Sequence, residues 1–470
     1  MKDVILSLKN INLKIKMAKP GIPQGTRDFS SETIKKRSYI LNTIKSTFEL
    51  FGFEPLETPA LENLSTLLGK YGDEGDKLIF KVLNNGLNDP KNIEKAKLGF
   101  EKILEGKNSE DITGRALRYD LTIPLARFIA MNFGQLTMPY KRFQIQQVWR
   151  ADRPQRGRYR EFTQCDADIV GSNSLINEIE LANIYHSVFS KLKLKDYELK
   201  INSRKILSAL ARLCGGDDKM TGITVAIDKL DKIGLDKVKE ELINVGLNEN
   251  ELSTVSEYLE ISGSDKEKIT KLNSLFSSDT EGLEGIQDLT NVIAQTQNTN
   301  ISIDLTLARG LNYYTGIIFE VKAPPSVKMG SIGGGGRYDN LTGLFGLKGV
   351  PGIGISFGVD RIYDVMGELN LFPPELIKGA TVMFLNLGKD ESEVAYSYLQ
   401  KLREKNISGE LFHENLKMDK QLKYADKKNI EYAVIIGSEE LKTKTAKIKK
   451  LKTGEQTIVD INDLVDYFVS

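Results

Sequence analysis

Cysteine and histidine are scarce in this sequence, and their scarcity excludes several kinds of site. The 470 residues contain two cysteines, Cys165 and Cys214, which are too few for a disulfide framework or for a zinc site built from cysteines. This usage fits the reducing cytoplasm, where we expect the chain to act. The two histidines, His186 and His413, restrict any hydrolase mechanism that needs a histidine base.

Net charge and long apolar runs are also lacking. The chain has 65 Lys+Arg against 64 Asp+Glu, so only local patches could bind a polyanion. No apolar run approaches the roughly 20 residues that are needed to span a bilayer. Residues 1–19 lack the apolar core and the cleavage site of a signal peptide, and we interpret them as a short basic extension.

Hydrophobic periodicity divides the rest of the chain, whose length is enough for two or three domains. Residues 31–51 have helical spacing and end at Gly52, and residues 81–113 predict a charged helical excursion between two strands. From 204 to about 299 the composition predicts a helical insertion. Strands alternate with helices over 378–470, which indicates a separate α/β domain.

An arginine-rich stretch, RADRPQRGRYREFTQCDADIVG at 150–171, contains the first candidate site. Alternation along a strand predicts one face that carries cations, then an aromatic ring, an amide and carboxylates. Arginine suits phosphate oxygens, a ring can stack on a base, and the acids could hold an ammonium or a ring N–H. A surface hairpin with weak ion pairs is the alternative. The predicted face consists of Arg158, Arg160, Phe162, Gln164, Asp166 and Asp168, with Cys165, Ala167 and Ile169 packed behind it.

A second candidate is the segment IDLTLARGLNYYTG, at 303–316. Strand alternation over 303–309 places Arg309 at the end of an apolar row. A partly buried guanidinium needs an anion, because an unpaired buried charge costs several kcal/mol. Tyr313 and Tyr314 follow at a glycine-flanked bend, where phenol groups can donate and accept hydrogen bonds.

Glycine-rich motifs supply a third candidate. In SIGGGGRYDNL, the glycines at 333–336 would let the backbone approach a ligand closely, with Arg337 and Tyr338 just beyond, although a flexible loop is the alternative. The P-loop pattern is missing. GISFG at 354–358 matches the nucleophile-elbow pattern of serine hydrolases, but His413 lies in the separate terminal domain.

Assembled, these segments resemble the histidyl-tRNA synthetases, a family of class II aminoacyl-tRNA synthetases, from about residue 20 to 470. GFEPLETPALE resembles class II motif 1, whose dimer-interface proline would be Pro59. FQIQQVWRADRPQRGRYREFTQCDADIVG resembles motif 2, and GIGISFGVDRI resembles motif 3, which includes Arg361. LARGLNYYTG and GGRYDNL resemble the two signatures that are peculiar to the histidine enzymes.

The resemblance implies a fold and a reaction. It implies an α+β catalytic domain on a mainly antiparallel sheet at 20–375, with the helical insertion at about 204–299, and a C-terminal α/β anticodon-binding domain at 378–470. The implied activity is that of a histidine–tRNA ligase, which converts L-histidine and ATP to histidyl-adenylate and transfers histidine to the 3′ end of tRNA(His). Mg²⁺ is expected with ATP, without a protein metal cluster. We also expect a homodimer and no membrane partner.

The resemblance also assigns roles to matching residues. Arg150 and Arg361 would bind the bent ATP, with Phe162 stacked on adenine opposite Arg361, and Arg309 would contact the α-phosphate. The implied catalytic residues are Arg309 and Arg150. The implied ATP-binding residues are Arg150, Arg158, Phe162, Arg309 and Arg361.

For the amino acid, the matching residues fall into two groups. Asp120 and Thr122, in LRYDLT, would hold the α-amino group together with Gln164, whereas Asp168, Tyr314 and Tyr338 would bind the imidazole. The implied histidine-binding residues are Asp120, Thr122, Gln164, Asp168, Tyr313, Tyr314 and Tyr338.

Some features depart from the family pattern. Asp120 stands where one bacterial branch has glutamate, and Asn312 replaces a common aspartate, which leaves the role of that side chain open. The lysine-rich segment 442–452 would contact tRNA phosphates or form a solvated face.

The rival interpretation is a non-catalytic relative that binds histidine and regulates another enzyme. The candidate phosphate-binding arginines and the terminal domain favour the ligase.

Overall fold

The computed structural model describes residues 20–308 and 313–469, so the expected extension at 1–19 lies outside the described residues. Of the described chain, 20–28 and 40–371 form one compact unit, and 29–39 with 372–469 form the other. No helix in these ranges is both long and apolar enough to cross a membrane. The domain boundaries given above remain predictions.

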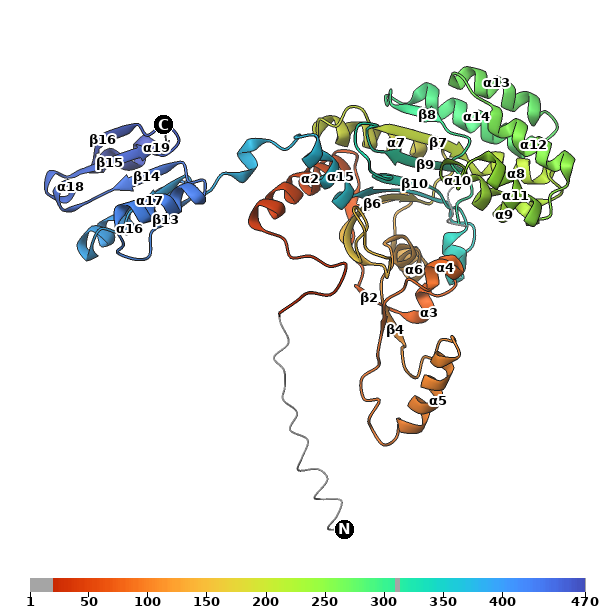
Figure 1. Ribbon diagram of the computed structural model, residues 1–470, viewed down its shortest axis with the longest axis horizontal. Helices are drawn as coiled ribbons and strands as arrows, with labels where there is room; N and C mark the ends of the chain where they lie inside the picture. The colour runs from red at the N-terminus through yellow and green to blue at the C-terminus, as the bar shows by residue number, and fades with distance from the viewer. Residues whose placement is uncertain (1–19, 309–312, 470) are drawn as a thin grey trace, which may run out of the picture. The chain divides into compact units, whose positions relative to one another are not determined.

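A mixed sheet of eight strands organises the first unit (Figure 1). Its inner neighbours all pair antiparallel, and parallel pairing occurs only at the two edges. This confirms the mainly antiparallel sheet that the motifs predicted. In spatial order the strands are β1 (Glu54–Pro55), β5 (Tyr140–Trp149), β6 (Glu161–Val170), β11 (Gly352–Gly358), β10 (Gly333–Arg337), β9 (Ile317–Lys322), β7 (Glu198–Ser203) and β8 (Ile301–Ile303).

One face of this sheet is covered by an aromatic core. Phe48, on α2 (Ser31–Leu50), lies 5.7 Å from Phe143 of β5 and 5.9 Å from Phe357 of β11, measured between ring centroids. Tyr185, on α7 (Ile176–Lys191), lies 4.8 Å from Phe357. In β6, Cys165, Ala167 and Ile169 are buried on this side, as predicted. The alternate residues of β6 therefore face the opposite side, where the candidate site lies.

A three-stranded sheet carries the excursion that the sequence predicted. Its strands are β2 (Leu61–Asn63), β4 (Arg115–Leu117) and β3 (Lys81–Val82), with α5 (Ile93–Leu104) in the connection between β3 and β4. Figure 1 shows α5 on a projecting arm of the first unit. The prediction of a helical excursion between two strands is confirmed.

The insertion is helical in its described residues, as predicted, and lies at the β7–β8 end of the sheet (Figure 1). Capping boxes begin two of its helices, because Asn248 and Ser264 each accept a hydrogen bond from the backbone N–H three residues on. The helices are α8 (Arg204–Leu213), α9 (Met220–Ile227), α10 (Leu230–Ile233), α11 (Leu235–Asn244), α12 (Glu249–Glu260), α13 (Asp265–Leu275) and α14 (Thr280–Gln295).

The second unit contains the predicted α/β pattern. Its five strands lie in the order β13-β12-β14-β15-β16, with parallel pairing up to β14 and antiparallel pairing beyond it. Buried Val382, Phe384 and Val434 pack with Leu399 and Leu402 of α16. The elements are β12 (Val382–Phe384), α16 (Lys389–Glu404), β13 (Gly409–Leu411), α17 (Met418–Lys427), β14 (Tyr432–Ile435), β15 (Thr445–Lys450) and β16 (Gln456–Asp460).

Two strand predictions were wrong. The predicted face does not extend to Arg158, because β6 begins only at Glu161 and Arg158 belongs to a tight turn closed by two backbone hydrogen bonds with Gln155. The Arg160 guanidinium donates to the carbonyl of Asp152 and is not part of the strand face. The strand predicted over 303–309 ends at Ile303, where the chain turns. Arg309 and Asn312 lie outside the described residues.

Candidate active site

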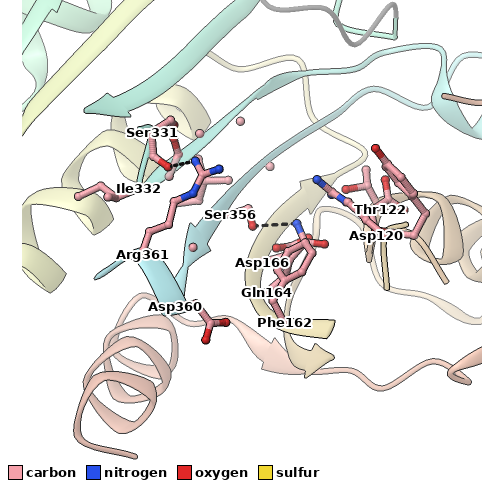
Figure 2. Close-up of a pocket in the computed structure, with 18 of the residues that line it drawn as sticks. Asp120, Thr122, Phe162, Gln164, Asp166, Ser331, Ile332, Ser356, Asp360 and Arg361 are labelled. Atoms are coloured by element: carbon pink, nitrogen blue, oxygen red, sulfur yellow. Dashed lines mark hydrogen bonds between the residues drawn. The ribbon is translucent and has the colours of Figure 1, made fainter. Parts of the chain in front are cut away.

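A cavity of about 430 Å³ opens on the face of the sheet opposite the aromatic core. This volume suits a small-molecule site, for which roughly 300–1,000 Å³ is usual. The cavity is lined by every described residue to which the resemblance gave a role in binding ATP or histidine: Asp120, Thr122, Arg150, Arg158, Phe162, Gln164, Asp168, Tyr313, Tyr314, Tyr338 and Arg361. Arg160 and Arg337, which the sequence patterns also indicated, do not line it. Figure 2 shows Arg361 on one side of the cavity and Asp120 and Thr122 on the other, with Gln164 and Asp166 between them.

Two arginines of the cavity donate hydrogen bonds to backbone carbonyls that orient them. Arg361 follows β11 on α15 (Val359–Glu368), and its Nε donates to the carbonyl of Gly157 at 2.8 Å. Arg150 follows β5, and its Nε donates to the carbonyl of Tyr119 at 3.1 Å. The Arg150 guanidinium also lies 4.3 Å from the ring centre of Tyr119 and 5.2 Å from that of Phe162. These contacts fix the direction of two cations, as an anion-binding site requires.

Asp168 is deeply buried in the lining of the cavity. It forms an ion pair of 2.8 Å with Arg142, whose side chain is fully buried, and it accepts a hydrogen bond from the Tyr338 hydroxyl. Burial raises the pKa of Asp168, whereas Arg142 and the tyrosine hydrogen bond oppose that shift. An ionised carboxylate has about four lone-pair sites, so Asp168 retains capacity for a ligand N–H.

Asp120 lies just before α6 (Thr122–Asn132). Its Oδ1 accepts hydrogen bonds from the backbone N–H of Ile123 at 3.1 Å and from the hydroxyl of Tyr71 at 2.9 Å. Burial is the main cause that raises the pKa of this carboxyl, and the Ile123 N–H opposes it. The helix start therefore holds Asp120 and Thr122 at one wall of the cavity.

Two glycines make the floor of the cavity possible. A Cβ on Gly354 would lie 1.9 Å from Oδ1 of Asp168, and a Cβ on Gly335 would lie 2.0 Å from the carbonyl oxygen of Gly354. The glycine run forms strand β10, so the flexible-loop alternative is wrong. Because β10 and β11 have no side chains at these positions, Asp168 and a ligand can approach the sheet closely.

The structure contradicts the serine hydrolase alternative. Ser356 lies inside β11 and not at a strand-to-helix turn, and its hydroxyl accepts a hydrogen bond of 3.2 Å from the Gln164 side chain. No histidine belongs to the described lining of the cavity. The serine therefore lacks the base that nucleophilic attack would need.

Comparison with known proteins agrees with this geometry. The chain matches the histidyl-tRNA synthetase family over residues 109–362 and the anticodon binding domain family over residues 381–470. The chain belongs to the histidyl-tRNA synthetase family. A relative from Christiangramia forsetii named histidine–tRNA ligase is 51% identical over 451 residues, and one from Flavobacterium johnsoniae with the same name is 49% identical over 467 residues. Each comparison covers 95% of this chain and 98% of the relative.

A solved structure supports the same assignment. The histidyl-tRNA synthetase from Nostoc sp. PCC 7120 is 29% identical, with a TM-score of 0.78 over 96% of this chain and 98% of that one. The family, the fold class and the reaction class that the motifs predicted are thereby confirmed. The roles given above to individual residues remain predictions.

Motif reasoning missed several residues that shape the cavity. Arg142 directly precedes the motif 2 segment, and its position opposite Asp168 follows from the β5–β6 register. Tyr71 comes from a distant segment and has no motif that marks it. Asp166 alternates with Gln164 and Asp168 along β6 and belongs to the predicted face, but the family resemblance assigned no role to it.

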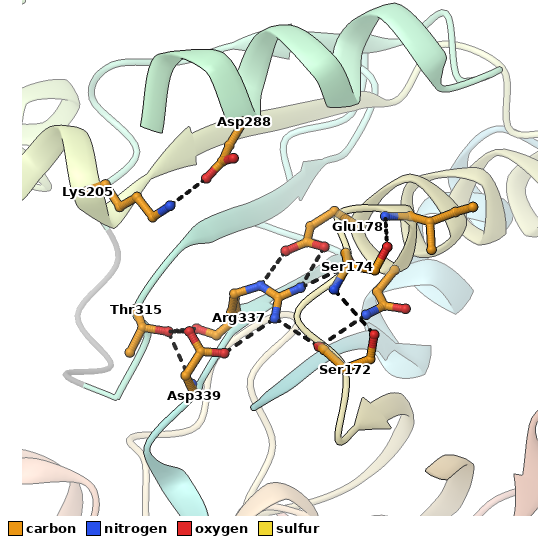
Figure 3. A network of polar contacts seen from close by, with 10 residues as sticks. Ser172, Ser174, Glu178, Lys205, Asp288, Thr315, Arg337 and Asp339 are labelled. Carbon is orange, nitrogen blue, oxygen red and sulfur yellow. Dashed lines mark hydrogen bonds and ion pairs between the residues drawn. The ribbon is translucent and has the colours of Figure 1, made fainter. Parts of the chain in front are cut away.

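Arg337, although adjacent to Tyr338, points away from the cavity into a polar network (Figure 3). Its guanidinium donates through two nitrogens to Glu178 of α7, with Nη2 2.8 Å from Oε2, and through Nη1 to Asp339 at 3.3 Å. The Glu178 side chain is fully buried. The pair therefore fixes β10 to α7 and leaves Tyr338 directed at Asp168.

We expect Glu178→Gln to destabilise the fold by about 3 kcal/mol, because a buried guanidinium would lose its main counterion. Urea unfolding of the full chain would measure the loss in the free energy of unfolding. A matched control is Lys97→Ala, since the exposed Glu94–Lys97 pair should contribute less than about 1 kcal/mol. Equal effects of the two substitutions would contradict a structural role for the buried pair.

Proposed function

We propose that the cavity beside β6 is the active site of a histidine–tRNA ligase, in which ATP and L-histidine bind side by side. The observation that supports this proposal is the common location of Arg150, Arg361 and Asp168 around one cavity. Fixed cations suit the phosphates of ATP, and buried carboxylates suit the basic groups of histidine.

In the first reaction, a carboxylate oxygen of histidine attacks the α-phosphorus of ATP, and the bond to the β-phosphate oxygen breaks to release pyrophosphate. The attacking carboxylate is already ionised at neutral pH, so the chain need not supply a base. Arg150 and Arg309 stabilise charge on the α-phosphate, and Phe162 with Arg361 holds the adenine. Mg²⁺ bound with ATP would neutralise part of the negative charge of its phosphates.

In the second reaction, the terminal ribose hydroxyl of tRNA(His) attacks the carbonyl carbon of the adenylate. The new ester bond forms, the bond from that carbon to the phosphate oxygen breaks, and AMP leaves. The hydroxyl proton passes to a phosphate oxygen of the adenylate. The C-terminal unit binds the anticodon, and the chain acts in the cytoplasm as a homodimer.

The test is histidine-dependent exchange of pyrophosphate into ATP, followed by charging of tRNA(His). We expect exchange with L-histidine and not with other amino acids, because a site of buried polar groups discriminates by factors up to about 10⁴–10⁵. Histidine binding without exchange would instead favour the non-catalytic regulator. Exchange that is independent of histidine would reject the assignment of the substrate.

A further inference from the structure

Asp166 is a buried carboxylate of the cavity that has no part in the mechanism above. It lies between Gln164 and Asp168 on the cavity face of β6, and it is 3% exposed. Its side chain lines the cavity (Figure 2). Its Oδ1 has no hydrogen-bond partner among the described residues.

The surroundings of Asp166 leave its charge poorly compensated. The charge of Arg142 acts on Asp166, but the ion pair of 2.8 Å that Arg142 forms is with Asp168. The residues opposite Asp166 on the neighbouring strands are Gln144 of β5 and Ser356 of β11, and both are uncharged. A buried carboxylate in this state is costly for the fold unless a ligand supplies the missing positive charge.

We propose that Asp166 is a substrate-binding residue that accepts a hydrogen bond from the α-ammonium group of the substrate amino acid. This inference rests on the proposed function. Along β6, Asp166 stands between Gln164, which is predicted to hold the amino group, and Asp168, which is predicted to bind the imidazole together with Tyr338. Asp166 and Asp168 are two residues apart, which is about 6.6 Å along a strand, so one amino acid can reach both.

The first experiment compares two ligands on the full chain and on Asp166→Asn. L-Histidine carries the ammonium group, whereas 3-(imidazol-4-yl)propionate lacks it and keeps the ring and the carboxylate. We expect Asp166→Asn to weaken histidine roughly 10- to 100-fold, the range for a lost hydrogen bond to a charged group. Binding of the propionate should stay within about twofold, because it makes no ammonium contact.

The control for this comparison is Asp288→Asn. Asp288 lies on α14, outside the cavity, and its carboxylate forms an ion pair of 2.8 Å with Lys205 of α8. We expect this variant to bind both ligands as the unaltered chain does. If Asp166→Asn weakens both ligands equally, or neither, the proposal is overturned. Failure of the unaltered chain to bind histidine at all would instead overturn the proposed function.

A second readout separates ligand binding from a structural role. Burial is the main cause that raises the pKa of Asp166 to about 7, and the negative charges of Asp168 and Asp120 raise it further. The charge of Arg142 and a hydrogen bond with Ser356 lower the pKa and so oppose this shift. Between the ordinary pKa of an aspartate and about 7, the folded chain keeps a proton that the unfolded chain releases. Stability therefore falls as pH rises through this window, and above it the full cost of the buried charge remains.

We expect Asp166→Asn to raise the Tm of the ligand-free chain at pH 8, with a gain that shrinks toward pH 5. Saturating L-histidine should then raise the Tm of the unaltered chain more than that of the variant. A Tm below that of the unaltered chain at pH 8 would assign Asp166 to the fold and overturn the proposal. Asp166→Ala is a second variant for which the same ligand preference is expected.

Discussion

Asp168→Asn is expected to raise the KM for histidine roughly 100-fold and to leave the KM for ATP within about twofold. The carboxylate lines the cavity, accepts a hydrogen bond from Tyr338 and carries the charge that would accept an imidazole N–H. Asparagine keeps the shape of the side chain and removes that charge. Pyrophosphate exchange at varied histidine and ATP concentrations would separate the two constants.

The ion pair with Arg142 imposes a control on this experiment. Arg142 is fully buried, so the loss of its counterion should also destabilise the fold, by about 3–5 kcal/mol. An unchanged KM for ATP, measured well below the Tm of the variant, would show that the site itself remains folded. Tyr338→Phe removes only the hydroxyl that donates to Asp168, and we expect a smaller rise in the histidine KM from it. Unaltered histidine kinetics in Asp168→Asn would refute the assignment.

Arg150→Ala is expected to lower kcat for pyrophosphate exchange roughly 100- to 1,000-fold, as loss of a fixed donor to transition-state charge does in other enzymes. The guanidinium is aimed by the Tyr119 carbonyl and held between the rings of Tyr119 and Phe162. The side chain is therefore already in place and need not reorganise when negative charge grows on the α-phosphate. Steady-state exchange rates at saturating ATP and histidine would measure the change in kcat.

Arg156 provides the matched control for Arg150. It belongs to the same arginine-rich segment, but its side chain is 57% exposed and pairs with Glu368 on the surface. Arg156→Ala should leave kcat unchanged within about twofold, because exposed ion pairs contribute little. If both variants lost activity equally, the effect would belong to the segment as a whole. A normal kcat in Arg150→Ala would reject a catalytic role for this residue.

The local sequence was enough to predict most elements of the chain. Alternation placed Gln164, Asp166 and Asp168 on one face of β6, and helical periodicity located the insertion and α5. These predictions succeeded because strand and helix periods are local properties of the backbone, which a few neighbouring side chains already express. The prediction that Arg158 shares this face was wrong, because backbone hydrogen bonds between Gln155 and Arg158 close a tight turn before β6 begins.

The tertiary structure decided which partners those side chains meet. Arg142 lies opposite Asp168 only because β5 and β6 pair in one particular register, and Tyr71 reaches Asp120 from a segment 49 residues away. Arg337 follows the glycine run directly, yet its guanidinium points away from the cavity and pairs with Glu178 of α7. A strand's sequence fixes the side of the sheet on which a residue lies, but the charge that compensates a buried carboxylate can come from any part of the chain. A buried charge is costly without a counterion, so the fold must supply one. Which residue supplies it depends on long-range packing and not on the neighbouring sequence.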